Sequence, residues 1–196
     1  MSPKTFHQSD ITAAVLSGGQ GRRLGGRDKG LEPLAGQTMI SHVLAAIQPQ
    51  VGKVFVCTSR NIGLYEQYAI ICRDEVSGFS GPMAAIASAS AACTTPWLLT
   101  VPVDCPQPPN DLVERLHCAD ARVAVAHDGT RRQPLFALYR KDVALSAASA
   151  LANDLPVWRW QDELHAVDVD FSSAAANFIN LNAAADFQRW EATHAI

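Results

Sequence analysis

Short apolar runs alternate with segments of helical periodicity along most of the chain, and this alternation predicts an α/β fold with a largely parallel sheet. No internal repeat, low-complexity tract or linker interrupts the pattern, so we expect a single domain over residues 1–196. The runs expected to form strands are Ile11–Ser17, Val54–Cys57, Ala69–Cys72, Trp97–Val103, Val123–His127, Leu135–Tyr139, Ala166–Val169 and Phe178–Leu181. The expected helices are Thr38–Gln48, Ile62–Tyr68, Pro82–Ala92, Pro109–Leu116, Asp142–Ala152 and Ala183–Trp190.

Three local signals refine this fold. The run Trp97–Val103 is apolar on both faces, which favours a central strand covered by helices on both sides and therefore a three-layer α/β/α arrangement. Pro82 fits the first turn of its helix, where the missing N–H does no harm. The turn dipeptide Asp128-Gly129 lies between two apolar runs and predicts a hairpin-like reversal. That reversal would place one antiparallel strand in the otherwise parallel sheet.

Composition excludes several classes of protein. Lys and Arg number 16 and Asp and Glu 19, a formal charge of −3, whereas nucleic-acid or membrane-surface binding typically needs a large positive patch. Hydrophobic residues make up 48%, too many for a disordered chain, and the longest apolar run is far shorter than the roughly 20 residues of a membrane span. The first ten residues contain no apolar segment typical of a secretory signal, and the five cysteines form no Cys-x-x-Cys pair. We therefore expect a cytoplasmic protein that binds neither nucleic acid nor membrane.

The most informative segment, residues 16–29, directly follows the first expected strand and reads LSGGQGRRLGGRDK. It contains five of the chain's 12 glycines, together with Arg22, Arg23, Arg27 and Lys29. Glycines allow backbone N–H groups to converge on phosphate oxygens, and the cations add positive charge at the same place. The segment therefore predicts a phosphate-binding loop; the alternative is a surface loop with solvated cations.

Two common phosphate loops do not match this segment. It contains no Gly-Lys-Ser/Thr, so it is not a Walker A loop. The dinucleotide fingerprint fails because Leu24 stands where Gly or Ala is needed. It fails again because Thr58-Ser59-Arg60, after the second strand, lacks the acidic residue that would hold a ribose. An NAD-dependent dehydrogenase is thus disfavoured.

The glycine-rich segment resembles the L-x-G-G-x-(x)-R-(M/L)-G-(x)-D-K signature of nucleotidyltransferases with a glycosyltransferase-A-like fold. The double glycine before Arg27–Leu31 is similar to that of molybdenum cofactor guanylyltransferases. Further matches follow in the expected order: Arg73-Asp74, Gly81–Ala84, Pro102–Pro106, Asp128-Gly129 with Gln133–Leu138, and Asn177–Asn182. The resemblance implies a Rossmann-like nucleotidyltransferase fold. It also implies transfer of GMP from GTP to the phosphate of molybdopterin, forming molybdopterin guanine dinucleotide and pyrophosphate.

The resemblance further implies a role for each matching residue. Arg23, Lys29 and Asp104 would be catalytic, and Asp104 would hold Mg²⁺, the expected cofactor. Asn180 and Asn182 would contact the acceptor. The expected GTP contacts are Leu16, Ser17, Gly18, Gly19, Lys29, Asp74 and Asp104.

Local sequence alone leaves structural roles open for these residues. Lys29 could be an exposed turn lysine, and Asp74 a loop or capping aspartate. Asp104 could form an Asx-turn before Pro106, and Asn182 could be the N-cap of the last helix.

Two features depart from the family pattern. Cys57 stands where an asparagine often contacts GTP. Residues 153–157 lack the arginine expected for acceptor binding, which Arg159 could replace. Arg131 and Arg132 could be solvated turn residues or could face the acceptor.

The six histidines and five cysteines form no recognisable catalytic triad or metal cluster in the sequence. This fits the implied chemistry, because the terminal phosphate of molybdopterin, with a second pKa of roughly 6 by analogy with phosphoesters, is largely a dianion at neutral pH. Positioning, Mg²⁺ and cations then suffice in principle. The alternatives are a molybdopterin cytidylyltransferase that uses CTP, a sugar-phosphate nucleotidyltransferase, and a non-enzymatic GTP-binding accessory module. Cofactor-synthesis proteins and molybdoenzyme chaperones are expected as transient partners.

Overall fold

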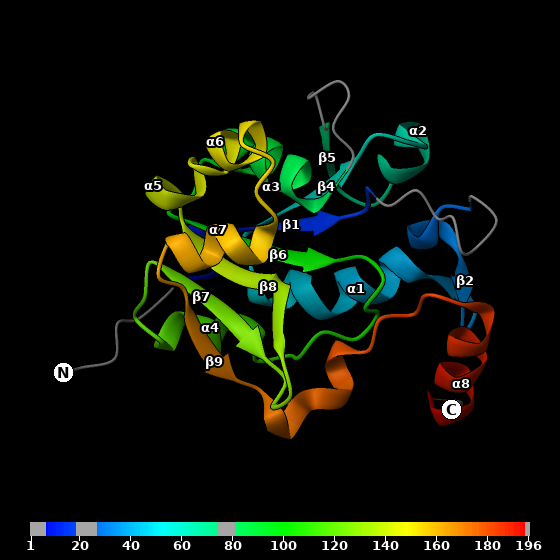
Figure 1. The fold of residues 1–196 in the computed structure, drawn as a ribbon. Coiled ribbons are helices and arrows are strands. Elements are labelled where there is room, and N and C mark those ends of the chain that lie inside the picture. The colour runs from blue at the N-terminus through cyan, green and yellow to red at the C-terminus, as the bar shows by residue number, and fades with distance from the viewer. Residues whose placement is uncertain (1–6, 19–26, 74–80, 195–196) are drawn as a thin grey trace.

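A seven-stranded sheet with helices on both faces forms the centre of the computed structural model, which describes residues 7–18, 27–73 and 81–194 (Figure 1). The strand order is β5-β4-β1-β6-β8-β7-β9. The strands are β1 (Ile11–Leu16), β4 (Lys53–Thr58), β5 (Ile70–Arg73), β6 (Trp97–Pro102), β7 (Val123–His127), β8 (Arg132–Arg140) and β9 (Val167–Asp170). A separate small hairpin, β2 (Pro33–Leu34) and β3 (Gln37–Thr38), lies in a segment that the sequence pattern predicts as loop.

The sheet is parallel except at one strand. β1 pairs in parallel with β4 and β6, whereas β8 runs antiparallel to β6 and β7, and β9 is parallel to β7. The predicted reversal at Asp128-Gly129 is confirmed, and β8 is the expected antiparallel strand. Gly129 has a φ of 93°, a left-handed value that favours glycine, and the Asp128 carboxylate accepts hydrogen bonds of 2.8 Å from the N–H groups of Thr130 and Arg131.

The helices form a layer on each face of the sheet, so the expected three-layer arrangement is confirmed (Figure 1). One layer holds α3 (Pro82–Ala92), α5 (Lys141–Ala144), α6 (Ala147–Ala152) and α7 (Val157–Glu163); the other holds α1 (Met39–Ile47), α2 (Ile62–Tyr65) and α4 (Leu112–Cys118). The 3₁₀ helices are η1 (Gln8–Asp10), η3 (Lys29–Leu31), η4 (Gln48–Gln50) and η5 (Ser172–Phe178). Within the described ranges, no helix combines the length and apolar character needed to cross a membrane.

Strand β1 explains why both faces need a helical cover. Its side chains alternate, with Ala14 and Leu16 in the apolar cluster under α3, and Ala13 and Val15 in the cluster under α1. All four side chains are buried. A strand that is buried on both faces is apolar at nearly every position, which is why this segment shows no polar alternation.

The C-terminal helix α8 (Ala184–His194) packs outside the two layers, beside the β2–β3 hairpin (Figure 1). The Trp190 ring meets the His42 ring of α1 edge-on, with 5.4 Å between centroids. Leu181, just before the helix, is also buried, against Leu34 and Met39. This docking brings the segment before α8 back to the carboxyl ends of the central strands.

Two predicted elements are wrong. The segment Phe178–Leu181 forms no strand, because Phe178 is the last residue of η5 and packs edge-on against Phe136 in the core instead. The helix expected over Asp142–Ala152 is broken into α5 and α6. At the break, both the N–H and the hydroxyl of Ser146 bond the carbonyl of Val143, and such local bonds compete with the helical pattern.

Helix α7 is absent from the sequence-based prediction. It begins after Pro156 and buries Trp160, whose ring stacks on Tyr139 of β8 with 5.1 Å between centroids. Gln161 is also buried and donates to the Tyr139 hydroxyl at 2.6 Å. The helix is thus stabilised by contacts with the sheet that its local sequence pattern does not predict.

Candidate functional site

Three polar side chains from distant parts of the chain meet at the carboxyl ends of the central strands. The Lys29 ammonium lies 3.3 Å from Oδ2 of Asp104, and it also donates to Oδ1 of Asn182. β1 and β6 are neighbours, so the segments that follow them emerge side by side. Ligands of open α/β sheets bind at this edge, and Lys29 and Asp104 lie together there.

The backbone places Lys29 in a tight turn. Lys29 opens η3, and Oδ1 of Asp28 accepts from the N–H of Gly30 at 3.2 Å, which caps this short helix. The Lys29 side chain is 20% exposed, so the reading of a fully exposed turn lysine does not hold. A partly desolvated ammonium exerts a stronger field on a nearby phosphate than a solvated one.

Asp104 has one carboxylate oxygen paired and one left over. Oδ2 faces Lys29, whereas Oδ1 is buried and has no hydrogen-bond partner among the described residues. A carboxylate oxygen that meets no donor is a suitable ligand for a hard cation such as Mg²⁺, which typically takes one or two protein carboxylates and completes its shell with phosphate oxygens and water. Over the described ranges no group of three or more His, Cys, Asp or Glu side chains could hold a metal by itself. The donor set therefore fits a cation that arrives with a phosphate ligand.

The segment before α8 supplies the amide groups. The Asn182 side chain bonds Lys29, while Asp186 in the first turn of α8 accepts from the N–H groups of Asn182 and Ala183 at 2.9 and 2.8 Å. The expected N-cap contact of Asn182 is thus replaced by a bond to the cluster. These two backbone donors are the main cause that holds the pKa of Asp186 below its ordinary value. Asn180 is partly buried, and its Oδ1 has no partner among the described residues.

Ser17 and Gly18 stand at the end of β1, where the glycine-rich segment begins. The Ser17 hydroxyl lies 2.7 Å from the hydroxyl of Tyr65 in α2, and the Tyr65 hydroxyl donates to Oδ1 of Asp28 at 2.6 Å. Tyr65 is completely buried, and burial, followed by the bond to Asp28, raises the pKa of its hydroxyl far above the ordinary value. Sequence reasoning missed Tyr65, because nothing in its local sequence marks it.

Other expected nucleotide contacts are placed as follows. Leu16 ends β1 and is buried in the core cluster under α3, so its contribution to a ligand would come from the backbone. Cys57 is buried as well, and its carbonyl accepts from the N–H of Ser17 at 2.9 Å. Gly19, Arg23 and Asp74 lie outside the described residues.

A cavity of about 230 Å³ opens beside this cluster, next to the end of β6. Its walls include Pro102 and Phe136, and its polar lining includes Asn180 and Arg131. The Arg131 side chain is 71% exposed, with only a long 4.0 Å contact to Asp128. Arg132, by contrast, is paired with Asp162 and Asp168 at 2.5 and 2.6 Å.

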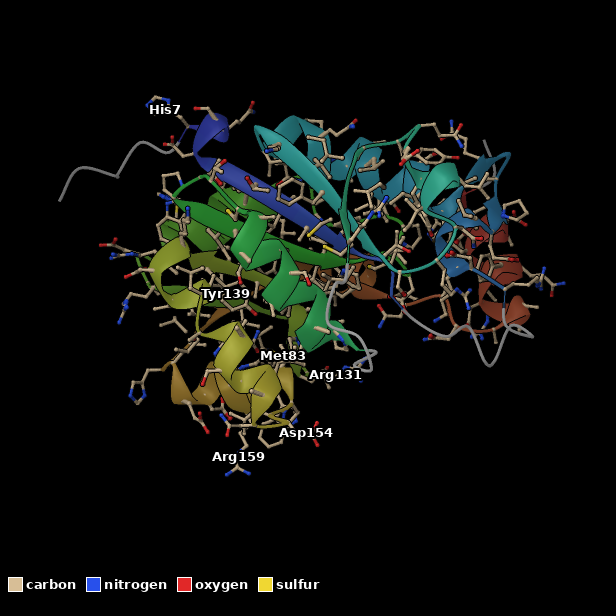
Figure 2. All side chains as sticks on the ribbon, turned by 90° about the horizontal axis from the view of Figure 1, so that it is seen from above. His7, Met83, Arg131, Tyr139, Asp154 and Arg159 are labelled. Carbon is tan, nitrogen blue, oxygen red and sulfur yellow. The ribbon has the colours of Figure 1, made fainter. Side chains whose placement is uncertain are left out.

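Arg159 is the residue that could replace the arginine missing from residues 153–157. Arg159 lies on α7 and points away from the body of the protein (Figure 2). Its side chain is 62% exposed and lies 3.9 Å from Glu163 on the same helix. A second cavity of about 420 Å³ lies nearby between the start of α3 and the loop before α7, and its walls are mostly apolar.

Comparisons with known proteins identify related sequences and a solved structure of similar fold. The family profile "MobA-like NTP transferase domain" matches residues 13–167. A molybdenum cofactor guanylyltransferase of Vibrio cholerae serotype O1 is 36% identical over 194 residues, covering 97% of this chain and 96% of the relative. One from Shewanella loihica is 39% identical, covering 88% and 91%. The crystal structure of molybdopterin-guanine dinucleotide biosynthesis protein A from Archaeoglobus fulgidus has a TM-score of 0.78 at 23% identity, covering 93% and 97%.

Proposed function

Because the chain belongs to the family of MobA-like NTP transferases, we propose that it transfers GMP from GTP to molybdopterin at the cluster of Lys29, Asp104 and Asn182. The observation that carries the site assignment is the pairing of Lys29 with one oxygen of Asp104, while the other oxygen is buried and has no partner among the described residues. This pair supplies a cation for phosphate oxygens and an anion for a metal at one place.

Lys29 acts on the phosphates of the nucleotide. A preorganised ammonium stabilises the negative charge that gathers on these oxygens as the bond to pyrophosphate breaks. Asn182 orients Lys29 by accepting a hydrogen bond from its ammonium group. The carboxylate of Asp104 lowers the cost of burying the charge of Lys29. Ser17 and Gly18 stand at the start of the glycine-rich segment, and the predicted contacts Gly19, Arg23 and Asp74 would complete the nucleotide site.

Asp104 is the proposed ligand of Mg²⁺. When bound, the ion supplies electrostatic stabilisation to phosphate oxygens. Asp104 is held in place for this by its own backbone, because its carbonyl accepts from the N–H of Leu181 at 2.8 Å. No residue is needed as a general base, since the attacking phosphate of molybdopterin is largely a dianion at neutral pH, with a second pKa of roughly 6.

The acceptor would occupy the cavity beside Asn180. A pterin is a flat heterocycle with donors and acceptors along its edges, so it suits an opening that combines apolar with polar walls and contains a buried amide oxygen with no donor among the described residues. Asn180 would accept from the ring, and Arg131 is exposed enough to turn toward a phosphate. Asn182, between this cavity and Lys29, would face both substrates.

A pyrophosphate-release assay tests this function directly. The purified chain is incubated with each of the four NTPs, alone, with molybdopterin or with a sugar phosphate, in buffer containing Mg²⁺. We expect release only with GTP and molybdopterin together. Release with CTP instead would identify a cytidylyltransferase, release with a sugar phosphate as acceptor would identify that class, and binding of GTP without any release would identify an accessory module.

Nucleotide and metal choice can also be read from thermal stability. A ligand that binds only the native state raises the melting temperature by mass action, so Mg-GTP should raise it clearly more than Mg-ATP or Mg-CTP. Replacing Mg²⁺ with EDTA should remove most of the difference. An equal or larger shift with CTP would contradict the guanine preference. A cytoplasmic location and transient contacts with cofactor-synthesis proteins and molybdoenzyme chaperones remain part of the proposal.

A further inference from the structure

Tyr65 joins the two ends of the glycine-rich segment, although it belongs to neither. Its hydroxyl lies 2.7 Å from the Ser17 hydroxyl, at the start of the segment, and 2.6 Å from Oδ1 of Asp28, the residue before Lys29. Tyr65 reaches this point from α2, which follows β4 and lies at the end of the sheet toward which β4 runs (Figure 1). One buried hydroxyl thus bridges positions that are eleven residues apart in sequence, from 17 to 28.

The direction of each proton follows from the chemistry of the groups. An ionised carboxylate only accepts, so the single proton of Tyr65 goes to Asp28. The Ser17 hydroxyl must then donate to the Tyr65 oxygen. The chain of bonds Ser17–Tyr65–Asp28 therefore has one polarity, and the charge of Asp28 strengthens its last bond.

Two neighbours show that the arrangement is tightly fitted. A Cβ on Gly30 would lie 2.2 Å from the Tyr65 hydroxyl oxygen and 3.0 Å from Oγ of Ser17, so only glycine allows this approach. On the other side, Asn61 donates to Oδ2 of Asp28 at 2.9 Å. Asp28 is thus held through both oxygens by residues 61–65, while its Oδ1 also caps the turn that contains Lys29.

We propose that Tyr65 is a positioning residue for the nucleotide site: it fixes Ser17 and Asp28 relative to each other and thereby places Lys29 before GTP arrives. The proposal rests on the GTP site proposed above. Without the Tyr65 hydroxyl, binding of GTP must itself order the two ends, and that cost appears as lower affinity. Once GTP is bound, its own contacts hold Ser17 and Asp28 in place. We therefore expect kcat to change less than the Kd for GTP.

The test compares Tyr65→Phe with a matched control, Tyr139→Phe. Tyr139 is also completely buried, and its hydroxyl also bonds a side chain, Gln161, but it lies on β8 in the other half of the sheet. For Tyr65→Phe we expect the Kd and KM for Mg-GTP to rise about tenfold, the size expected for losing a hydrogen bond to a charged group, with a smaller change in kcat. For Tyr139→Phe we expect lower thermal stability with Kd and KM within about twofold of wild type.

Two further variants keep the test decisive if Tyr65→Phe folds poorly. Gly30→Ala keeps the hydroxyl but displaces it, and should raise the Kd in the same direction. Asn61→Gly removes the exposed bond to Asp28 and tolerates the left-handed φ of 51° at this position, and should raise the Kd by about twofold. Hydrogen exchange of the ligand-free protein is the second readout: amides of residues 27–34 should exchange faster in Tyr65→Phe but not in Tyr139→Phe.

The outcomes separate this inference from the proposed function. If wild type releases pyrophosphate from GTP and Tyr65→Phe binds GTP as wild type does, with unchanged exchange over residues 27–34, the positioning role is overturned and the function stands. Equal losses of GTP affinity in Tyr65→Phe and Tyr139→Phe would also overturn it, because they would indicate general destabilisation. If wild type itself neither binds GTP nor releases pyrophosphate, the proposed function fails first and the inference fails with it.

Discussion

The two halves of the sheet use similar polar groups in opposite ways. In the half formed by β5, β4, β1 and β6, Lys29 pairs with one oxygen of Asp104, and the other oxygen is buried with no partner in the part of the chain that the structure describes. In the half formed by β8, β7 and β9, Arg132 binds both Asp162 and Asp168 and joins β8 to α7 and β9. The charges of the second arrangement are paired within the protein, whereas the first leaves one buried oxygen without a partner among the described residues. An unsatisfied buried polar atom costs stability, and at the edge of the sheet where ligands bind we interpret this oxygen as a ligand position.

The same contrast holds for the two buried tyrosines. The hydroxyl of Tyr139 bonds Gln161 inside the core, and burial raises its pKa above the ordinary value. The hydroxyl of Tyr65 bonds Asp28 and Ser17 beside the glycine-rich segment. One tyrosine connects two elements of the scaffold, while the other connects the scaffold to the residues around Lys29.

Among the variants that test this contrast, Lys29→Ala should show the largest effect, a loss of turnover. We expect turnover with GTP and molybdopterin to fall about 10²-fold or more, as for loss of other preorganised donors in a transition state. The melting temperature without ligand should change little, because Lys29 contributes little to the apolar core. Steady-state pyrophosphate release and thermal melting measure the two effects.

The matched control for Lys29→Ala is Arg122→Ala. Arg122 also pairs with an aspartate, Asp142, at 3.1 Å, but at the opposite ends of the strands, and its side chain is 61% exposed. Turnover should stay at the wild-type value in this variant. Full activity of Lys29→Ala would remove Lys29 from the site.

Asp104→Asn separates a metal ligand from a turn residue. Asparagine keeps the shape and serves equally in an Asx-turn, so melting without ligand should stay near normal. If Asp104 holds Mg²⁺, loss of the anionic oxygen should lower turnover strongly, by about 10²-fold, and high Mg²⁺ should restore part of it. The measurement is a Mg²⁺ titration of initial rates. Wild-type rates at low Mg²⁺ would leave only the turn role.

Arg132→Ala should act on stability more than the two site variants do. Arg132 is 23% exposed, whereas Asp162 and Asp168 are 53% and 42% exposed, so solvent screens both pairs. We therefore expect a loss of only about 1 kcal/mol in the free energy of unfolding. Urea unfolding at low and high salt tests this, and the loss should shrink as salt rises. If Asp104→Asn lowered the free energy of unfolding more than Arg132→Ala does, the contrast between the two halves would be reversed.

Asp186→Asn should have the smallest effect, and one that depends on pH. The N–H groups of Asn182 and Ala183 hold the pKa of Asp186 below its ordinary value of 3.8. A carboxyl with a lowered pKa in the folded state contributes stability that is present above its unfolded pKa and is lost as the pH falls through the folded pKa. The variant should therefore melt about 1–2 °C below wild type at pH 7, and the difference should disappear toward pH 2. A difference independent of pH would exclude the charge of Asp186 as its cause.

Elements with strong local signals could be predicted from the sequence. The helix over Pro82–Ala92 is found with its predicted bounds, because proline favours the first turn and the alanine-rich stretch favours a helix throughout. The reversal at Asp128-Gly129 follows from a glycine that tolerates positive φ. In the site, Lys29 and Asp104 could be brought together because the carboxyl ends of parallel strands share one edge, whereas Asn182 could be selected only through the family resemblance.

What only the tertiary structure decided lies where contacts between distant segments outweigh local preference. Phe178–Leu181 has the composition of a strand but forms none, because burial against Phe136 stabilises it without a ladder. Helix α7 depends on the stacking of Trp160 on Tyr139, across the layers. Tyr65 shows the same limit at the site: its residue type was visible in the sequence, but its bonds to Ser17 and Asp28 exist only once β1, α2 and η3 are packed together. Local periodicity reports which face of an element is buried, whereas the partner on that face is chosen by the packing of the whole sheet.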